Sequence, residues 1–138
     1  SRFGLIFQDH KLLYDRNCFE NVILPLHING VTGQEAAKRV RAALDKVGLL
    51  NKEKAMPITL SGGEQQRIAV ARALINQPAL VFADEPSGNL DTENANALHQ
   101  LFFELRSEMK QSFVIVTHNE AFAQMADRSL IMKDGRFV

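Results

Sequence analysis

The chain lacks several features that would assign its class at once. It has a single cysteine, Cys18, which excludes an intrachain disulfide framework and a cysteine-rich zinc site. Its longest apolar runs, 79–83 and 113–116, have the length of strands and fall far short of the roughly 20 residues that span a bilayer. Charge of one sign is also lacking, because 16 Lys and Arg balance 16 Asp and Glu. Composition therefore gives no support for DNA or an anionic membrane as a dominant partner, and no nucleic acid is expected.

The composition that is present describes one globular domain. The chain has 138 residues, of which 46% are hydrophobic and 23% charged, enough to build a core. It contains no internal repeat and no linker rich in glycine, serine or proline. The start, residues 1–4, is neither an initiator methionine nor a signal peptide, and 3–7 already has the pattern of a strand. We therefore expect the natural protein to be longer.

The first half, about 9–76, has a mainly helical pattern. One helix should begin at Thr32, because Thr32 and Glu35 have the spacing of a capping box, and should end near Gly48. A second, well-buried helix should run from about 63 to 75, where alanine and other small apolar residues are frequent.

The second half, about 77–138, alternates strands and helices. The run 79–83 shows no polar alternation, which predicts a strand buried on both faces in a parallel sheet. A helix over 92–109 and a strand over 113–116 follow, so a right-handed parallel crossover is expected. We also expect a short helix at about 120–125 and a hairpin over 129–138, turning at Asp134-Gly135.

Polar side chains follow both buried strands. Asp84 and Glu85 come after the first, and His118 follows the second, so all three should meet where ligands collect in open α/β sheets. Asp84 could hold Mg²⁺, Glu85 could orient or deprotonate water, and His118 could hydrogen-bond a phosphate. The alternative is that the acids cap a turn and the histidine belongs to the core.

A second candidate site precedes the helix at 63–75. Ser61, Gly62 and Gly63 offer a hydroxyl and accessible backbone N–H groups at a helix N-terminus, which favours an anion. The alternative is a helix-capping turn without a ligand.

Five segments together resemble the motifs of ATP-binding-cassette (ABC) ATPases. Residues 60–65 resemble the signature motif, 80–85 the Walker B strand with its catalytic glutamate, and 87–91 the D-loop. His118 resembles the switch histidine, and Gln8 in 6–8 the Q-loop glutamine. The order and spacing agree over nearly the whole chain, whereas each motif alone is a weak signal. Finer similarity, in 7–8, 20–22 and 86–91, points to the lipoprotein-releasing, cell-division and macrolide-export subgroup, and we favour the lipoprotein-releasing type.

The resemblance implies a P-loop NTPase α/β fold, here the helical signature region plus part of the parallel-sheet core. It implies ATP and Mg²⁺ as cofactors, and a head-to-tail dimer that encloses two ATP molecules. By the same resemblance, Glu85 and His118 are the catalytic residues, and Asp84 and Gln8 serve the metal. The cofactor-binding residues that it implies are Gln8, Ser61, Gly62, Gly63, Glu64 and Asp91.

The resemblance also implies partners and a location. ABC transporter ATPases dock on integral-membrane permease subunits, so the protein is expected to be cytoplasmic and peripheral on the inner membrane. Gln8 would sense Mg²⁺ and the permease, and Asp91 would link the two ATP sites. The cargo is chosen by the membrane subunits, so this sequence does not identify it.

One family motif is absent. No Gly-x-x-x-x-Gly-Lys-Ser/Thr loop, the Walker A motif, occurs in the chain, and in the family it lies upstream of the Q-loop. We therefore expect this chain alone to bind ATP poorly and not to hydrolyse it measurably. We also expect the strand at 79–84 to lack its flanking strands, which would expose apolar edges.

Two other classes of protein remain as alternatives. ATPases of chromosome maintenance and DNA repair carry similar motifs, but their signature follows a long coiled coil, and here about 50 residues without heptads separate Gln8 from Ser61. A non-catalytic interaction module is disfavoured, because Gln8, Asp84, Glu85 and His118 all keep chemically competent types. Among the remaining residues, Cys18 is expected to be a small packing residue and His99 to be solvated.

Overall fold

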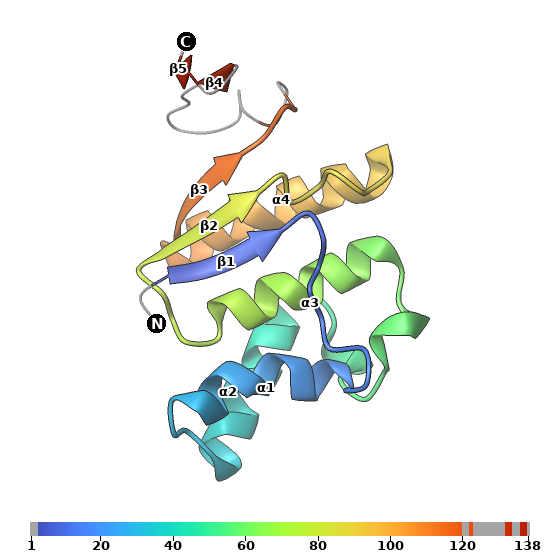
Figure 1. The fold of residues 1–138 in the computed structure, drawn as a ribbon. Coiled ribbons are helices and arrows are strands. Elements are labelled where there is room, and N and C mark those ends of the chain that lie inside the picture. Colours follow the sequence, from blue (N-terminus) through green and yellow to red (C-terminus); the bar gives the residue numbers. More distant parts are fainter. Residues whose placement is uncertain (1–2, 120–121, 123–131, 134–135, 138) are drawn as a thin grey trace.

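The fold is a three-stranded parallel sheet with helices on one side (Figure 1). The computed structural model describes residues 3–119, 122, 132–133 and 136–137, the last four by their backbone. The strands are β1 (Phe3–Phe7), β2 (Leu80–Asp84), β3 (Ser112–Val116), β4 (Met132–Lys133) and β5 (Arg136–Phe137). The helices are α1 (Cys18–Ile28), α2 (Gly33–Lys46), α3 (Gly62–Leu74) and α4 (Thr92–Met109), with 3₁₀ turns at Leu50–Lys52 and Pro57–Thr59. No helix of the described part is long and apolar enough to cross a membrane.

The sheet has the order β1-β2-β3, with every pair parallel. The expected parallel crossover, 80–84 to 112–116 through α4, is therefore confirmed. The expectation that the strand at 79–84 lacks flanking strands is wrong. This strand, β2, lies in the centre of the sheet, with β1 on one side and β3 on the other. Residues 3–7, whose pattern predicted a strand, supply one of these neighbours, but that pattern did not show which strand they pair with.

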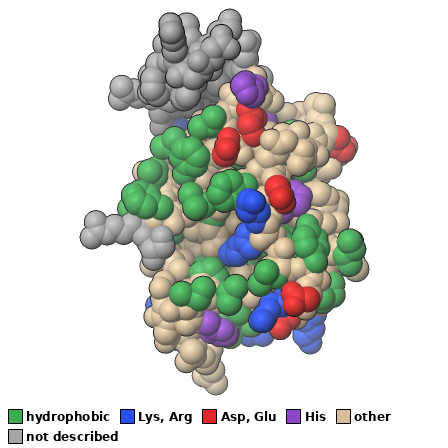
Figure 2. Space-filling view, in the orientation of Figure 1, with side chains coloured by type: hydrophobic (Ala, Val, Ile, Leu, Met, Phe, Trp, Pro, Cys, Tyr) green, Lys and Arg blue, Asp and Glu red, His purple; other side chains and the backbone are tan. Residues whose placement is uncertain are grey.

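The prediction that the strand at 79–83 is buried on both faces is also wrong. Val81 and Ala83 are fully buried, but Phe82 on the opposite face is 36% exposed. The helices cover only one face of the sheet, and the other face presents apolar side chains to solvent. Figure 2 shows hydrophobic side chains gathered over the strands on that open face. Its exposed apolar members are Phe3, Leu5, Phe82, Val114 and Val116.

Helix α3 lies at the centre of the helical layer that covers one face of the sheet. It contacts β1, α1, α2 and α4, and most of its residues are buried. Small side chains make these close contacts possible, as Gly63 shows. A Cβ atom there would lie 2.5 Å from Asn94 Oδ1 on α4, so the helices approach within a distance that only glycine permits. The predicted bounds of this helix, 63–75, differ by one residue from those observed.

The helix ends agree with the sequence in part. Helix α4 has the predicted bounds, and α2 ends before Gly48, whose φ of +76° provides the left-handed stop. The capping box predicted at Thr32 and Glu35 is wrong, because Thr32 makes no side-chain capping bond. The helix begins at Gly33 with φ +66°, which departs from the helical geometry a capping box needs, and Glu35 pairs with Arg39 instead.

The C-terminal predictions are tested only in part. The strands β4 and β5 pair antiparallel, as expected for the hairpin over 129–138, and its remaining residues lie outside the described part. The helix expected at 120–125 also lies outside it, apart from Phe122, which is helical and buried.

Candidate functional site

The three strands end together at one edge of the sheet. Phe7, Asp84 and Val116 are partners in register, so the chain leaves the sheet at adjacent points. Gln8, Glu85 and Thr117 follow immediately. The segments after β2 and β3, which the sequence predicted to converge, therefore meet at this edge, and the pairing of β1 brings Gln8 to it as well.

Glu85 is held by the segment that follows β3. Its backbone N–H donates to the Val116 carbonyl at 2.7 Å. Thr117 Oγ1 donates to Glu85 Oε2 at 3.3 Å, and the His118 backbone N–H donates to Oε1. The backbone of Glu85 has φ +45°, a left-handed conformation that is uncommon for a non-glycine residue. The Glu85 carboxylate thus has a defined direction, and sequence reasoning assigned no such role to Thr117.

His118 is exposed rather than part of a core. Its side chain is 94% exposed, so the core alternative is wrong for this residue. Its Nε2 lies 3.7 Å from Glu85 Oε1. An imidazole in this place can reach a ligand beside Glu85 and can hydrogen-bond to it.

Asp84 is the residue best suited to a cation. It ends β2 and is exposed, and no hydrogen bond to its carboxylate occurs within the described part of the chain. No group of three or more His, Cys, Asp or Glu residues that could hold a metal ion is found among the described residues. Mg²⁺ needs no such cage, since it keeps several waters and uses one or two carboxylates plus substrate phosphates. The donor set at Asp84 therefore fits Mg²⁺ delivered with a nucleotide.

Gln8 lies against the loop that follows Glu85. Its Nε2 donates to Asn89 Oδ1 at 2.8 Å, and Asn89 Nδ2 donates to the Gln8 carbonyl at 3.3 Å. A Cβ atom on Gly88 would lie 2.6 Å from Gln8 Cδ. The absence of a side chain at position 88 thus makes room for the Gln8 amide.

The signature-like segment forms the N-terminus of α3. Ser61 is the N-cap, and its Oγ accepts from the Glu64 N–H at 3.1 Å, while Glu64 Oε1 accepts from the Ser61 N–H at 3.0 Å. The capping-turn alternative is therefore correct as a description of the local structure. It does not exclude an anion, because other N–H groups of the first turn, at Gly62 and Gly63, lie at the positive end of the helix.

Asp91 begins α4 in a similar way. Its Oδ1 accepts from the Asn94 backbone N–H at 2.8 Å and from Asn94 Nδ2 at 3.0 Å. This N-cap explains why α4 starts at Thr92. A role for Asp91 between two ATP sites stays a prediction.

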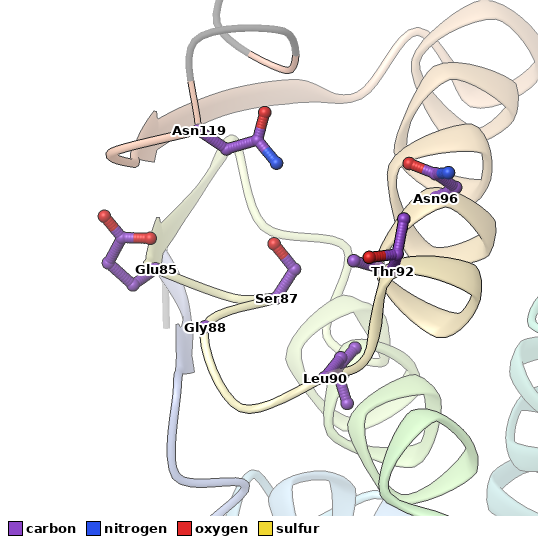
Figure 3. A pocket seen from close by; sticks show the side chains of 8 residues that line it. Glu85, Ser87, Gly88, Leu90, Thr92, Asn96 and Asn119 are labelled. Atoms are coloured by element: carbon purple, nitrogen blue, oxygen red, sulfur yellow. The ribbon is translucent and has the colours of Figure 1, made fainter.

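An open cavity of about 210 Å³ lies between the loop after β2 and the start of α4 (Figure 3). Glu85 stands at its rim with its carboxylate directed away from α4. The lining residues are Glu85, Ser87, Gly88, Leu90, Thr92, Ala95, Asn96 and Asn119.

His99 is the clearest error of the sequence reasoning, which expected it to be solvated. It is 4% exposed, its Nε2 lies 2.8 Å from Ser87 Oγ, and its ring stacks on Phe122 with centroids 3.7 Å apart. Burial lowers the pKa of His99 from its usual value, so the neutral ring is favoured. His99 comes four residues after Ala95 and three before Phe102, and both of these are buried. This helical spacing places His99 on the inward face of α4 and could have predicted its burial from the sequence.

Comparison with known proteins shows which family the chain is similar to. The pattern of the ABC transporter family matches residues 1–88. The chain is 53% identical over 135 residues to the lipoprotein-releasing system ATP-binding protein LolD of Bacteroides fragilis, covering 98% of this chain and 62% of that protein. It is 47% identical over 135 residues to the cell division ATP-binding protein FtsE of Escherichia coli K12, covering 97% and 60%.

Comparison of the fold with solved structures indicates the same family. The dimeric structure of MJ0796, a bacterial ABC transporter cassette, is 36% identical with a TM-score of 0.83, and the match covers 98% of this chain and 60% of that one. The predicted architecture, a helical signature region with part of the P-loop NTPase sheet, is confirmed. The chain spans about three fifths of the length of the curated relatives it matches. By sequence and by fold, it belongs to the ABC transporter family and forms part of an ATP-binding subunit's nucleotide-binding domain.

Proposed function

We propose that the complete protein hydrolyses ATP to drive a membrane permease of the lipoprotein-releasing type. The observation that carries the proposal is the Glu85 carboxylate, aimed by Thr117 and His118 beside the exposed carboxylate of Asp84. Relatives named for lipoprotein release are 49% to 55% identical, against 47% for the cell-division protein, which favours the first type.

The chemistry follows from the side chains at the sheet edge. Glu85 accepts a hydrogen bond on each oxygen, and these bonds hold the carboxylate in one orientation, as a positioned general base requires. Its remaining lone pairs can orient a water and take its proton as it attacks the γ-phosphate. Bound Mg²⁺, held by Asp84 and reached by Gln8, would neutralise charge on the phosphates. The exposed His118 ring would hydrogen-bond the γ-phosphate.

The signature segment would serve the ATP of a second subunit. Ser61 and Gly62 are exposed at the N-terminus of α3, Gly63 is buried next to them, and Glu64 completes the cap. A helix N-terminus of this kind favours a phosphate. A head-to-tail dimer would bring it to the other subunit's nucleotide, and Asp91 would lie between the two sites. The match to a cassette solved as a dimer supports this assembly.

The proposed location is the cytoplasmic face of the inner membrane, through docking on integral-membrane permease subunits. The chain itself contains no Walker A sequence, so we propose that 138 residues alone bind ATP poorly and do not turn it over. Titration calorimetry of Mg-ATP into this chain and into the complete reading frame tests that point. Equal binding by both would overturn it.

The catalytic assignment is tested with Glu85→Gln in the complete protein. The substitution keeps the size of the side chain and removes its basicity, so kcat should fall about 10²–10⁴-fold while ATP binding persists. Trapping of an ATP-bound dimer, measured by size-exclusion chromatography, should accompany the loss.

The matched control is Glu20→Gln. Glu20 is at the third position of α1, where glutamine preserves the capping box, so Glu20→Gln should leave turnover unchanged. Wild-type turnover in Glu85→Gln would show that Glu85 is not the base. Release of a lipoprotein from proteoliposomes that contain the co-expressed permease would test the cargo class separately.

A further inference from the structure

Gln66 on α3 is a fully buried polar side chain that the proposed mechanism does not use. Its Nε2 donates to the Phe7 carbonyl at 2.8 Å and to the Pro86 carbonyl, and its Oε1 lies 2.8 Å from His10 Nδ1. The three partners come from two segments distant in sequence from α3, residues 7–10 and the turn at Pro86. Phe7 directly precedes Gln8, and Pro86 directly follows Glu85.

The hydrogen-bond roles in this cluster follow from chemistry. Both carbonyl oxygens can only accept, so the Nε2 donors of Gln66 must face them. Oε1 can then only accept, so His10 must carry a proton on Nδ1 and donate it. Every polar group of the buried amide is thereby used, and no other residue type of similar size offers two donors and an acceptor in this arrangement.

A second contact from the same helix holds the Gln8 segment. Arg72 Nη1 donates to the Lys11 carbonyl at 2.9 Å, and Nη2 donates to the His10 carbonyl at 3.1 Å. The segment after Gln8 is therefore attached to α3 through Gln66 and Arg72, and farther along it the Tyr14 hydroxyl donates to Gln65 Oε1 at 2.8 Å. Within the described part of the chain, the loop after Glu85 accepts one hydrogen bond from an α3 side chain, that from Gln66 to the Pro86 carbonyl.

We propose that Gln66 is a positioning residue that links the signature helix to the Gln8 and Glu85 segments, with His10 Nδ1–H completing the link. Gln66 lies about one turn beyond Gly62 and Gly63 on the same helix. A shift of that helix when a ligand binds its N-terminus would be transmitted through one buried amide to Gln8 and to the left-handed turn at Glu85. The inference rests on the proposed ATPase function.

The chain offers a matched control for a purely structural role. Gln111 is also a buried amide, and its Nε2 also donates to two carbonyls, of Pro78 at 3.2 Å and Ser112 at 3.1 Å. Those carbonyls lie at the other end of β2 and β3, away from the candidate site. Gln66→Met and Gln111→Met each remove a buried amide and keep the side-chain length.

The test measures kcat, KM for ATP and melting temperature in the complete protein. Both variants should lower the melting temperature, but only Gln66→Met should lower kcat, by about 10- to 100-fold, with KM for ATP changed less than about twofold. His10→Leu, which keeps Gln66 but removes the N–H that donates to its Oε1, should also lower kcat. His10→Asn should restore most of it, because asparagine offers an N–H close to the position of Nδ1.

The outcomes separate the two proposals. An inactive wild-type protein would overturn the proposed function, and this inference with it. An active wild type in which Gln66→Met and Gln111→Met have equal effects on kcat, or in which His10→Leu matches wild type, would overturn the inference alone. If Gln66→Met does not fold, the two His10 variants decide.

Discussion

Replacing Gly88 by alanine should displace the Gln8 amide while leaving the fold intact. The new Cβ atom would lie 2.6 Å from Gln8 Cδ and 2.9 Å from its Nε2 and Oε1. Unbonded heavy atoms pack at about 3.5–4.0 Å, so the amide must withdraw by about 1 Å. Gln8 is exposed and its end is flexible, so it can move without disturbing the backbone.

The expected cost in stability is small. Withdrawal breaks the Gln8–Asn89 hydrogen bond, which is worth about 0.5–1.5 kcal/mol, whereas glycine-to-alanine replacement stabilises by about 0.4–1 kcal/mol through the unfolded chain. The two effects nearly cancel, so the melting temperature should change by less than about 4 °C. The expected cost in activity is larger, because a misplacement of about 1 Å in a site can lower kcat about 100-fold.

The assay is steady-state ATP hydrolysis by the complete protein together with thermal unfolding. Asn89→Ala is the matched control, since it removes the same hydrogen bond without the steric conflict and should lower kcat less than Gly88→Ala. Unchanged kcat in Gly88→Ala would refute the argument that the position of Gln8 matters. A fall in melting temperature above about 10 °C would show that backbone, rather than the Gln8 side chain, yields to the new atom.

Three further predictions address stability and reactivity. Gly4→Ala should lower the free energy of unfolding in urea by about 1–3 kcal/mol, because its Cβ atom would lie 2.6 Å from the Ala73 carbonyl oxygen and neither backbone can swing away; wild-type stability would contradict this. Burial lowers the pKa of His99 in the folded protein, so the neutral ring stabilises the fold fully at pH values above the unfolded pKa of about 6.5. As the pH falls below that value toward the folded pKa, this stabilisation is lost by at most about 1.4 kcal/mol per pH unit. Urea unfolding at pH 7 and 5.5 should show a smaller loss in His99→Gln, and equal losses would oppose the assignment. Burial, aided by the nearby charge of Glu64, raises the pKa of the Cys18 thiol, so Ellman's reagent at pH 8 should label it only after unfolding; rapid labelling of the native protein would be inconsistent with its buried position.

Some elements were predictable from local sequence alone. The bounds of α4, 92–109, follow from its apolar period and from Asp91 as N-cap, both of which act within one or two turns. Cys18 was expected to be a small packing residue, and it is fully buried. The prediction from local sequence was wrong at the start of α2. There Gly33 has φ +66°, and the capping box expected from Thr32 and Glu35 does not form.

Other features depended on partners distant in sequence. The exposure of Phe82 results from helices that cover a single face of the sheet, and no pattern within 80–84 reports that. The burial of His99 requires Ser87 and Phe122 from two other segments. Thr117 acquires a role only because β3 lies beside β2, which brings its hydroxyl to Glu85.

The sequence by itself determined the family, the order of β1, β2 and β3 with α2, α3 and α4, and the edge where Asp84, Glu85 and His118 would meet, whereas α1 was not predicted. These follow from motif spacing and from the rule that parallel strands end together. Tertiary structure decided which face of the sheet is covered, how Glu85 is aimed and which buried amide joins α3 to the segments of Gln8 and Glu85. The physical reason is that a hydrogen bond such as that from Gln66 to Phe7 forms only when α3 packs against β1. The periodicity of a sequence describes a single helix or strand and contains no information on which elements pack together.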